Sequence, residues 1–371
     1  MEAKEEKKKK RRLLWIILIF VILIMLISNK TVKNKVQDLF YRSDKSLQLI
    51  DNININWPQP GKIRIYSDKI IRYSSKEISM YDIEGTERWE KTLEDNGSIV
   101  YLGEGIIYIA STVTGKVEAF DLNGKQLWVY DAKQSIHRIA ERNRYLVLFT
   151  QAGENIEQVI ILDNKGNLQA NTTINKGKIL SCSVSPNHKN FTLVTLEVAD
   201  GSINSNLIYF KINGQEIWRK DYNDHIIYDV LFLDNDSMIV VCDNKILKLS
   251  VKNDLLWSRA IEGELKDIEV DANNNKIYVL YGQANSKLEE ISSNGRTKNK
   301  IELDSDYDNI YINKKYILLK GKKIIAGVNS DRVDLKYSYS EDIKGIGVYN
   351  DNIIIFTEKN TLITKPISID G

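Results

Sequence analysis

The chain has 371 residues, of which 43% are hydrophobic and 27% charged, so it can bury a large core and is not a disordered sequence. Its formal net charge is +2, but residues 1–12 hold seven of the 52 basic and three of the 50 acidic residues, which leaves 45 basic against 47 acidic in residues 13–371. Such a near-neutral body lacks the basic footprint of a nucleic-acid-binding protein, so we expect no nucleic-acid partner.

The N-terminus carries a membrane-targeting signal. Residues 7–12 read KKKKRR, and residues 13–27, LLWIILIFVILIMLI, contain no polar side chain. Fifteen residues is short of the roughly 20 that cross a bilayer as a helix, and is the upper end of a signal-peptide core. Because large residues fill the run and no small-residue cleavage site follows, we expect an uncleaved transmembrane signal-anchor helix over 13–28. A cleaved signal and a buried soluble helix are the alternatives.

Charge bias sets the expected orientation. The basic excess before the apolar run favours a cytoplasmic segment 1–12 and an extracytoplasmic chain after residue 28. A basic cluster is also typical of a nuclear-localisation or nucleic-acid-binding segment. Because this one lies directly beside the apolar run, we interpret it as the determinant of membrane orientation. Residues 29–45 are expected to form a juxtamembrane helix or linker, since Val32, Val36, Leu39 and Phe40 fall on one helical face. These features predict a single-pass protein of the cell membrane.

From residue 46 onwards the sequence repeats a hairpin phrase. Glycine precedes the last position of the phrase by four residues at Gly85, Gly124, Gly166, Gly214 and Gly295, and Asn253 replaces it once. Glycine and asparagine readily adopt the positive φ of a two-residue hairpin turn, so we expect such turns here. The seven copies are MYDIEGTERW (80–89), AFDLNGKQLW (119–128), ILDNKGNLQA (161–170), YFKINGQEIW (209–218), KLSVKNDLLW (248–257), EISSNGRTKN (290–299) and AGVNSDRVDL (326–335).

A companion phrase, a polar turn followed by apolar β-formers, lies upstream of each hairpin and occurs eight times. Successive copies begin 36 to 47 residues apart. A period near 40 with four strands per unit is typical of a β-propeller. The first apolar residues of the copies are Ile70, Ile106, Tyr145, Phe191, Met238, Ile277, Tyr316 and Ile353.

The unequal counts of the two phrases predict how the ring closes. The eighth unit reaches residue 371 before it can form an outer strand, whereas Ser46–Ile55 precedes the first unit and belongs to no copy. Pairing the two would remove an open edge that invites aggregation. We therefore expect residues 46–371 to form an eight-bladed β-propeller. Seven blades is the alternative, because the seventh and eighth units are degenerate.

Four copies of the hairpin phrase end in tryptophan: Trp89, Trp128, Trp218 and Trp257. A large ring that recurs once per blade is expected to fill the seam with the neighbouring blade, burying roughly 150–250 Å². We interpret these tryptophans and the turn glycines as structural residues of the blade seams.

The combination of an apolar residue, Asp and a Gly four residues before Trp, as in FDLNGKQLW, resembles the repeat of quinoprotein dehydrogenases and PQQ-like propellers. This family includes an eight-bladed scaffold, the bacterial outer-membrane assembly lipoprotein. Anchor and propeller together look like an uncharacterised membrane-anchored family of low-GC Gram-positive bacteria. The copy at 209–218 has Lys211 in place of the Asp, and Ala170, Asn299 and Leu335 replace the Trp in three copies. The resemblance implies a fold that enzymes and scaffolds share.

A quinoprotein-type enzyme would carry a Ca²⁺ site, a vicinal disulfide and a catalytic Asp. Cys182 and Cys242 lie 60 residues apart, and no residue can be assigned as a catalytic, cofactor-binding or metal-binding group. We expect two buried free thiols. The alternative is a disulfide between them, if the exterior is oxidising.

Other polar features suit structural roles. His137, His188 and His225 are expected to be structural or solvated. The run DSDYDN (304–309) resembles a Ca²⁺ loop, but Lys315 stands where the loop needs Glu, which favours an inter-blade turn. NWPQPGK (56–62) is expected to be a packed connector, with an exposed contact as the alternative.

The absence of a catalytic motif favours a non-enzymatic, membrane-anchored scaffold that binds other proteins of the cell envelope. A surface receptor for cell-wall glycan or a small ligand is the second hypothesis, which a channel lined by Trp and Tyr would support. A degenerate quinoprotein-type enzyme is the third.

Overall fold

The computed structural model describes residues 45–93, 97–154, 156–199, 201–223 and 225–368, and every regular element in these ranges is a β-strand. Within them, no helix has the length and apolar character needed to cross a bilayer. The expected cytoplasmic segment 1–12, the anchor helix 13–28 and nearly all of the linker 29–45 lie outside the described residues.

The first three sheets each consist of four consecutive antiparallel strands. They comprise β2 (Gly61–Tyr66), β3 (Lys69–Ser74), β4 (Glu77–Asp82) and β5 (Glu87–Thr92); β6 (Ser98–Leu102), β7 (Ile106–Ser111), β8 (Lys116–Asp121) and β9 (Gln126–Asp131); and β10 (Ile136–Arg142), β11 (Tyr145–Gly153), β12 (Ile156–Leu162) and β13 (Leu168–Ile174).

The next three sheets follow the same plan. They comprise β14 (Lys178–Val184), β15 (Asn190–Ala199), β16 (Ser202–Lys211) and β17 (Glu216–Tyr222); β18 (Ile227–Phe232), β19 (Ser237–Cys242), β20 (Lys245–Ser250) and β21 (Leu255–Ala260); and β22 (Leu265–Asp271), β23 (Lys276–Gly282), β24 (Ser286–Ser292) and β25 (Thr297–Glu302).

The remaining strands form one eight-stranded sheet of order β26-β27-β28-β29-β1-β32-β31-β30. β1 runs antiparallel to β32, from Lys45 opposite Ser368 to Ile53 opposite Thr361, and meets β29 in parallel at Lys45 and Leu335. The pairing expected between the N-terminal segment and the last unit is confirmed. The strands are β26 (Asn309–Ile312), β27 (Ile317–Lys320), β28 (Ile324–Asn329), β29 (Arg332–Ser338), β1 (Lys45–Ile53), β32 (Thr361–Ser368), β31 (Asn352–Thr357) and β30 (Ile343–Tyr349).

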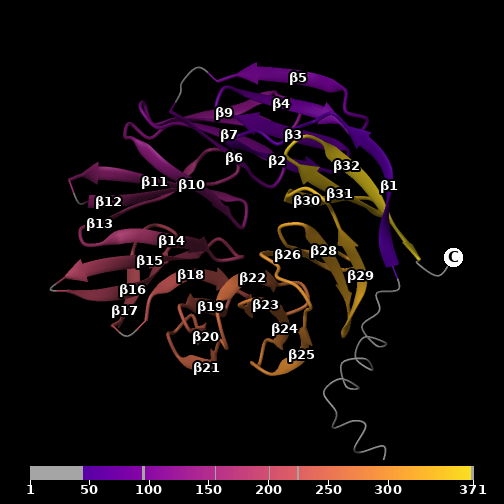
Figure 1. Ribbon diagram of the computed structural model, residues 1–371. Helices are drawn as coiled ribbons and strands as arrows, with labels where there is room; N and C mark the ends of the chain where they lie inside the picture. The colour runs from indigo at the N-terminus through magenta and orange to yellow at the C-terminus, as the bar shows by residue number, and fades with distance from the viewer. Residues whose placement is uncertain (1–44, 94–96, 155, 200, 224, 369–371) are drawn as a thin grey trace, which may run out of the picture.

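The sheets are arranged around a central axis, with the first strand of each unit innermost, so the predicted all-β propeller is confirmed (Figure 1). The chain returns to its start at the centre as well as at the rim, because β2 and β30 lie side by side there (Figure 1).

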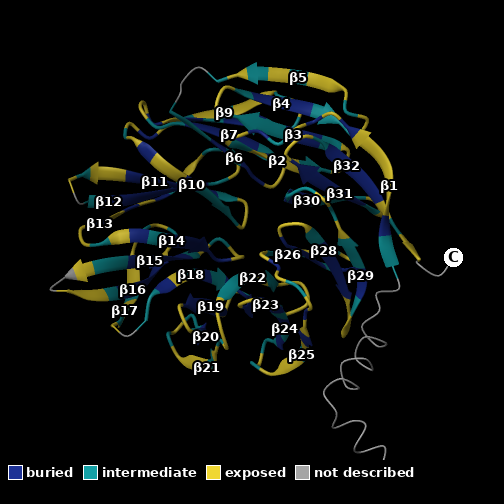
Figure 2. Cartoon of the chain, viewed as in Figure 1, coloured by how far each residue is buried: buried dark blue, intermediate teal, exposed yellow. Residues whose placement is uncertain are grey.

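The core lies between neighbouring sheets. The middle strands read as apolar runs buried on both faces, as in β19, where every residue is buried, whereas the outer strands alternate with exposed positions (Figure 2). One cluster joins Tyr108 and Val117 of the second sheet to Leu146 and Ile160 of the third. Each sheet therefore depends on its neighbours for burial, which explains why the units occur as a ring.

The expectation of two-residue hairpin turns is wrong. In the second sheet the Gly124 amide donates to the Asp121 carbonyl oxygen at 3.1 Å, and the Asp121 amide donates to the Lys125 carbonyl oxygen at 2.9 Å. Gly124 has φ +80°, whereas Asn123 keeps a negative φ. This is a three-residue loop with a glycine bulge. The Asp121 carboxylate favours it, because it accepts the amides of Asn123 and Lys125 at 2.8 and 2.9 Å.

Candidate functional site

The four repeat tryptophans contact the hairpin turn of the next sheet. The Trp89 indole N–H donates to the Leu122 carbonyl oxygen at 3.2 Å, and Trp128 donates to Asn164 at 3.0 Å. The same bond recurs from Trp218 to Val251 at 2.8 Å and from Trp257 to Ser293 at 3.0 Å. Each ring thus joins the outer strand of one sheet to the next.

Three of the five turn glycines lie under these rings, and the other two face different side chains of a neighbouring sheet. A Cβ atom on Gly124 would lie 3.2 Å from the Trp89 ring, one on Gly166 would lie 2.7 Å from Trp128, and one on Gly295 would lie 2.8 Å from Trp257. A Cβ atom on Gly85 would collide with the Ile53 side chain of β1, and one on Gly214 would lie 3.1 Å from the Thr172 hydroxyl oxygen. Glycine is therefore required twice, for its positive φ and for the close approach. The sequence predicted structural roles for the repeat tryptophans and the turn glycines, but it did not predict that they contact each other across neighbouring sheets.

Where the repeat lacks tryptophan, other contacts take its place. The Asn299 side-chain amide donates to the Ser330 carbonyl oxygen at 2.5 Å, which reproduces the bond of the indole. Leu335 is fully buried beside β1. A cavity of 460 Å³ opens beside Asn299 and Ser330, where the smaller amide leaves space unfilled.

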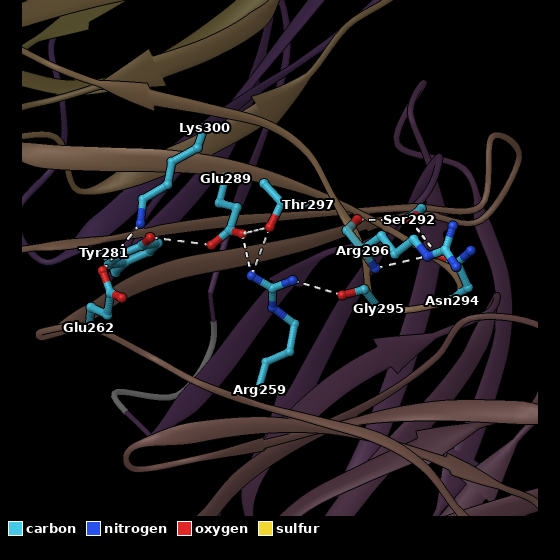
Figure 3. Close-up of polar contacts among 10 residues, drawn as sticks. All are labelled: Arg259, Glu262, Tyr281, Glu289, Ser292, Asn294, Gly295, Arg296, Thr297 and Lys300. Carbon is cyan, nitrogen blue, oxygen red and sulfur yellow. Dashed lines mark hydrogen bonds and ion pairs between the residues drawn. The ribbon is translucent and has the colours of Figure 1, made fainter.

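A buried ion pair fastens the fifth and sixth sheets together (Figure 3). The Arg259 guanidinium of β21 contacts Glu289 of β24, and donates to the Gly295 carbonyl oxygen at 2.7 Å and the Thr297 hydroxyl at 2.9 Å. The Glu289 carboxylate, whose side chain is 8% exposed, also accepts the hydroxyls of Thr297 at 2.5 Å and Tyr281 at 3.2 Å. Both charged groups are satisfied by the protein itself, as a structural network requires.

The central channel carries carboxylates with raised pKa values. Burial raises the pKa of Asp267 on β22, although its carboxylate accepts the Ile310 amide of β26 at 2.7 Å. On the same strand, desolvation by the surrounding protein and then the charge of Asp267 raise the pKa of Glu269 to about 7, although part of its side chain is exposed to water. Asp229 of β18 instead has a cation nearby, Arg142 at 3.5 Å.

A cavity of 940 Å³ lies between the innermost strands β2, β26 and β30, where the first sheet meets the last. Four basic side chains line it: Lys62, Arg64, Lys314 and Lys344. Trp57 and Tyr311 supply aromatic surface, and Asn309, Asn313 and Asn350 supply amides. No sequence motif pointed to this cavity, because its walls come from segments almost 300 residues apart.

The cysteines and histidines are not brought together as a site. Cys182 and Cys242 are free and buried, and burial raises their thiol pKa values to about 12 and 11. The His188 Nε2–H donates to the Asn143 carbonyl oxygen at 2.8 Å, and the ring stacks on Tyr145. His137 lies 3.7 Å from Glu157. His225 lies 3.4 Å from Asp243. No group of three potential metal ligands occurs among the described residues.

The two remaining segments have packed roles. In the acidic run 304–309, Asp304 and Lys336 form an ion pair, Asp306 accepts the Ser286 hydroxyl at 3.0 Å, and Asp308 lies 3.6 Å from Lys320. The run links β25 to β26, between two units of the ring. Trp57 of the segment 56–62 packs on Phe356, with ring centroids 6.2 Å apart.

Comparison with protein families gives one match. A model described as "Family of unknown function (DUF5711)" matches residues 29–365. The chain belongs to the DUF5711 family. The match spans the whole predicted juxtamembrane segment, 29–45, and the propeller as far as residue 365. No curated protein matches the chain.

Solved structures similar to this DUF5711 chain are propellers of low sequence identity. BamB from Moraxella catarrhalis is 12% identical, with a TM-score of 0.54 over 86% of this chain and 97% of that one. Saccharomyces cerevisiae Sqt1 is 8% identical, with a TM-score of 0.58 over 87% and 98%. Because 1082 chains of solved structures show such similarity, the likeness identifies the fold and leaves function to the site.

Proposed function

We propose that this DUF5711 chain is an eight-bladed propeller, held outside the cell membrane by an N-terminal anchor helix, that acts as a non-enzymatic scaffold for other envelope proteins. Six separate four-stranded sheets, together with the two halves of the eight-stranded sheet, support a count of eight. The basic cluster and apolar run of residues 7–27 support the anchor and its orientation. In this proposal the repeat tryptophans and glycines keep the disc rigid.

One surface feature carries the scaffold function: the long hairpin of β15 and β16. Each strand has 10 residues, whereas the flanking β14 and β17 have seven. β14 pairs only as far as Leu196, and β17 only as far as Ser205. The tip therefore projects past its neighbours (Figure 1).

The projecting tip presents an apolar pair. Val198 lies opposite Ile203 across the two strands, with exposures of 70% and 44%. A cross-strand aliphatic pair at the end of a projecting hairpin is costly to leave in water and suits contact with a partner protein. A protein whose apolar residues cover this pair is the partner that we propose.

Photo-crosslinking in living cells tests the scaffold function. A photoreactive residue at position 198 or 203 should capture the same envelope protein, and capture from 198 should be lost when Ile203 is changed to Lys. The control position is Leu127 on the outer strand β9, because its exposure of 46% matches that of Ile203. Equal capture from Leu127, or no adduct at either hairpin position, would contradict a docking role for the hairpin.

Location is tested separately. Both native thiols are buried, so a Leu127→Cys variant offers one accessible thiol. A membrane-impermeant maleimide should label it in intact cells, and the chain should remain with the membrane after alkaline extraction. Labelling that requires cell lysis would overturn the proposed topology, whatever the crosslinking result.

A second function, a receptor for a glycan or small ligand, is favoured by one observation. The cavity between β2, β26 and β30 is lined by Trp57 and Tyr311, and its 940 Å³ is within the range of small-molecule sites.

A further inference from the structure

All the charged residues that line the cavity between β2, β26 and β30 are basic. Lys62 and Arg64 come from β2, Lys344 comes from β30, and Lys314 comes from the turn after β26. Among the described residues that line it there is no aspartate or glutamate. Three lysines and one arginine therefore line one space that can hold a small molecule.

These cations have unused binding capacity. Within the described ranges, the side chains of Lys62, Lys314 and Lys344 make no hydrogen bond or ion pair with another residue, whereas lysines such as Lys178 and Lys276 are paired with glutamates. Arg64 uses one guanidinium nitrogen to donate to the Leu102 carbonyl oxygen at 2.5 Å. Its guanidinium also lies over the Tyr66 ring, 5.1 Å from the ring centroid. The ammonium groups of the three lysines are therefore the charges that remain available for a ligand.

The fold leaves room for an organic ligand beside these charges. A Cβ atom at position 345 would lie 3.1 Å from the Trp57 ring, so glycine there permits the indole to reach the cavity. The Trp57 amide is fixed by the carbonyl oxygens of Thr357 at 3.3 Å and Glu358 at 3.2 Å. An aromatic surface held in place can stack on a ring or sugar face.

The nearest carboxylates of the channel lie outside the lining of the cavity. Asp267 and Glu269 belong to β22, on the far side of β26, and their charges act on Tyr311 after the larger effect of burial, which raises the pKa of that phenol. Glu141 acts on Arg64 from β10. The carboxylates that act on residues of the cavity therefore belong to β10 and β22, and none of them is part of its lining.

We propose that this cavity binds a small organic molecule carrying two or more phosphate or carboxylate groups. A single monovalent anion would leave most of the three unpaired lysine charges uncompensated and most of the 940 Å³ empty. The amides of Asn309, Asn313 and Asn350 provide donors and acceptors for hydroxyl groups on such a molecule. The inference rests on the receptor function proposed above and specifies its ligand.

Calorimetric titration of the full-length chain in detergent tests the proposal. The probes are inorganic triphosphate and citrate, which distinguish phosphate from carboxylate, with sucrose as the neutral probe. Binding of triphosphate or citrate should weaken as salt rises, since the attraction is screened. Lys62→Ala and Lys344→Ala should each weaken it about tenfold, the usual effect of losing a bond to a charged group, and Lys344→Arg should retain it. Lys125→Ala, in an exposed turn of the second sheet, is the matched control.

The outcomes separate the ligand class from the receptor function. No binding of either anion at millimolar concentration, or equal weakening by Lys125→Ala, overturns the proposal. Binding of sucrose that depends on Trp57 but not on Lys62 and Lys344 overturns the anionic class while retaining a receptor. Melting curves of each variant, unchanged within one degree, show that the loss of binding comes from the site.

Discussion

The ion pair between Arg259 and Glu289 offers a sharp test of how the sheets are held together. Arg259→Met keeps the length of the side chain but leaves the Glu289 carboxylate, 8% exposed, without its cation. Removing one partner of a buried pair typically costs about 3–5 kcal/mol. We expect a value near 3 kcal/mol, because the Arg259 side chain is 25% exposed and the hydroxyls of Thr297 and Tyr281 still bind the carboxylate.

The double variant separates the pair from its surroundings. Arg259→Met combined with Glu289→Leu removes both charges and leaves an apolar contact, which should cost no more than about 1 kcal/mol. The two single losses would then sum to much more than the double loss, and the difference is the coupling energy. Arg219→Met is the matched control, because its pairing with Glu216 at 3.1 Å has side chains 43% and 42% exposed and should contribute below about 0.5 kcal/mol.

Urea unfolding of the full-length chain, followed by tryptophan fluorescence, measures these free energies. Calorimetry should show the Arg259→Met loss as a fall of about 4 °C in melting temperature, because the unfolding entropy of roughly 320 residues is about 0.7 kcal/mol/K. An equal cost for Arg259→Met and Arg219→Met would refute the argument that the network joins two sheets. So would a double variant that loses the sum of the single variants.

Three further predictions concern the seams and the channel. Gly166→Ala should lower the free energy of unfolding by about 2–4 kcal/mol, because the new methyl would lie 2.7 Å from the Trp128 ring at a residue with φ +81°. Gly105→Ala is the control, since it has φ +80° but open space around it, and it should lower that free energy by only about 1–2 kcal/mol in urea unfolding. Asn299→Trp should raise the melting temperature by filling the 460 Å³ cavity, and a fall in calorimetry would show that this seam cannot accept an indole. Glu269 has a pKa of about 7 in the folded state, above its ordinary 4.5, so between these values the folded chain binds more protons than the unfolded chain and stability falls as pH rises. Glu269→Gln should therefore reduce the fall in unfolding free energy between pH 5 and 8, and an unchanged slope would contradict the raised pKa.

Local patterns in the sequence predicted the elements that depend on local chemistry. The period near 40 residues identified the sheets, and the surplus companion phrase located the strand that pairs with β32. The turn type was missed because Asn123-Gly124 favours a two-residue turn in isolation, whereas Asp121 binds two amides and selects the longer loop.

Contacts between sheets could not be predicted in the same way. Which ring lies over which turn depends on the distance and rotation between neighbouring sheets, so the contact of Trp128 with Gly166 has no sequence signal in either repeat alone. The cavity between β2, β26 and β30 was even less predictable from the sequence. Lys62 and Lys344 are ordinary polar residues in strands, and they meet only because the ring closes.

The way the ring closes explains why the cavity lies where it does. The backbone hydrogen bonds of closure are at the rim, where β1 pairs with β32. At the centre, β2 and β30 belong to different sheets. The Ile65 side chain packs where a Cβ of residue 347 would lie, and the Trp57 ring packs against Gly345. No backbone hydrogen bonds join β2 to β30, so these two strands need not lie at hydrogen-bonding distance. The space between them can therefore be lined by Lys62 and Lys344 without paired acids. The rim can therefore supply the stability of the ring, and the centre is left free to carry a charged site.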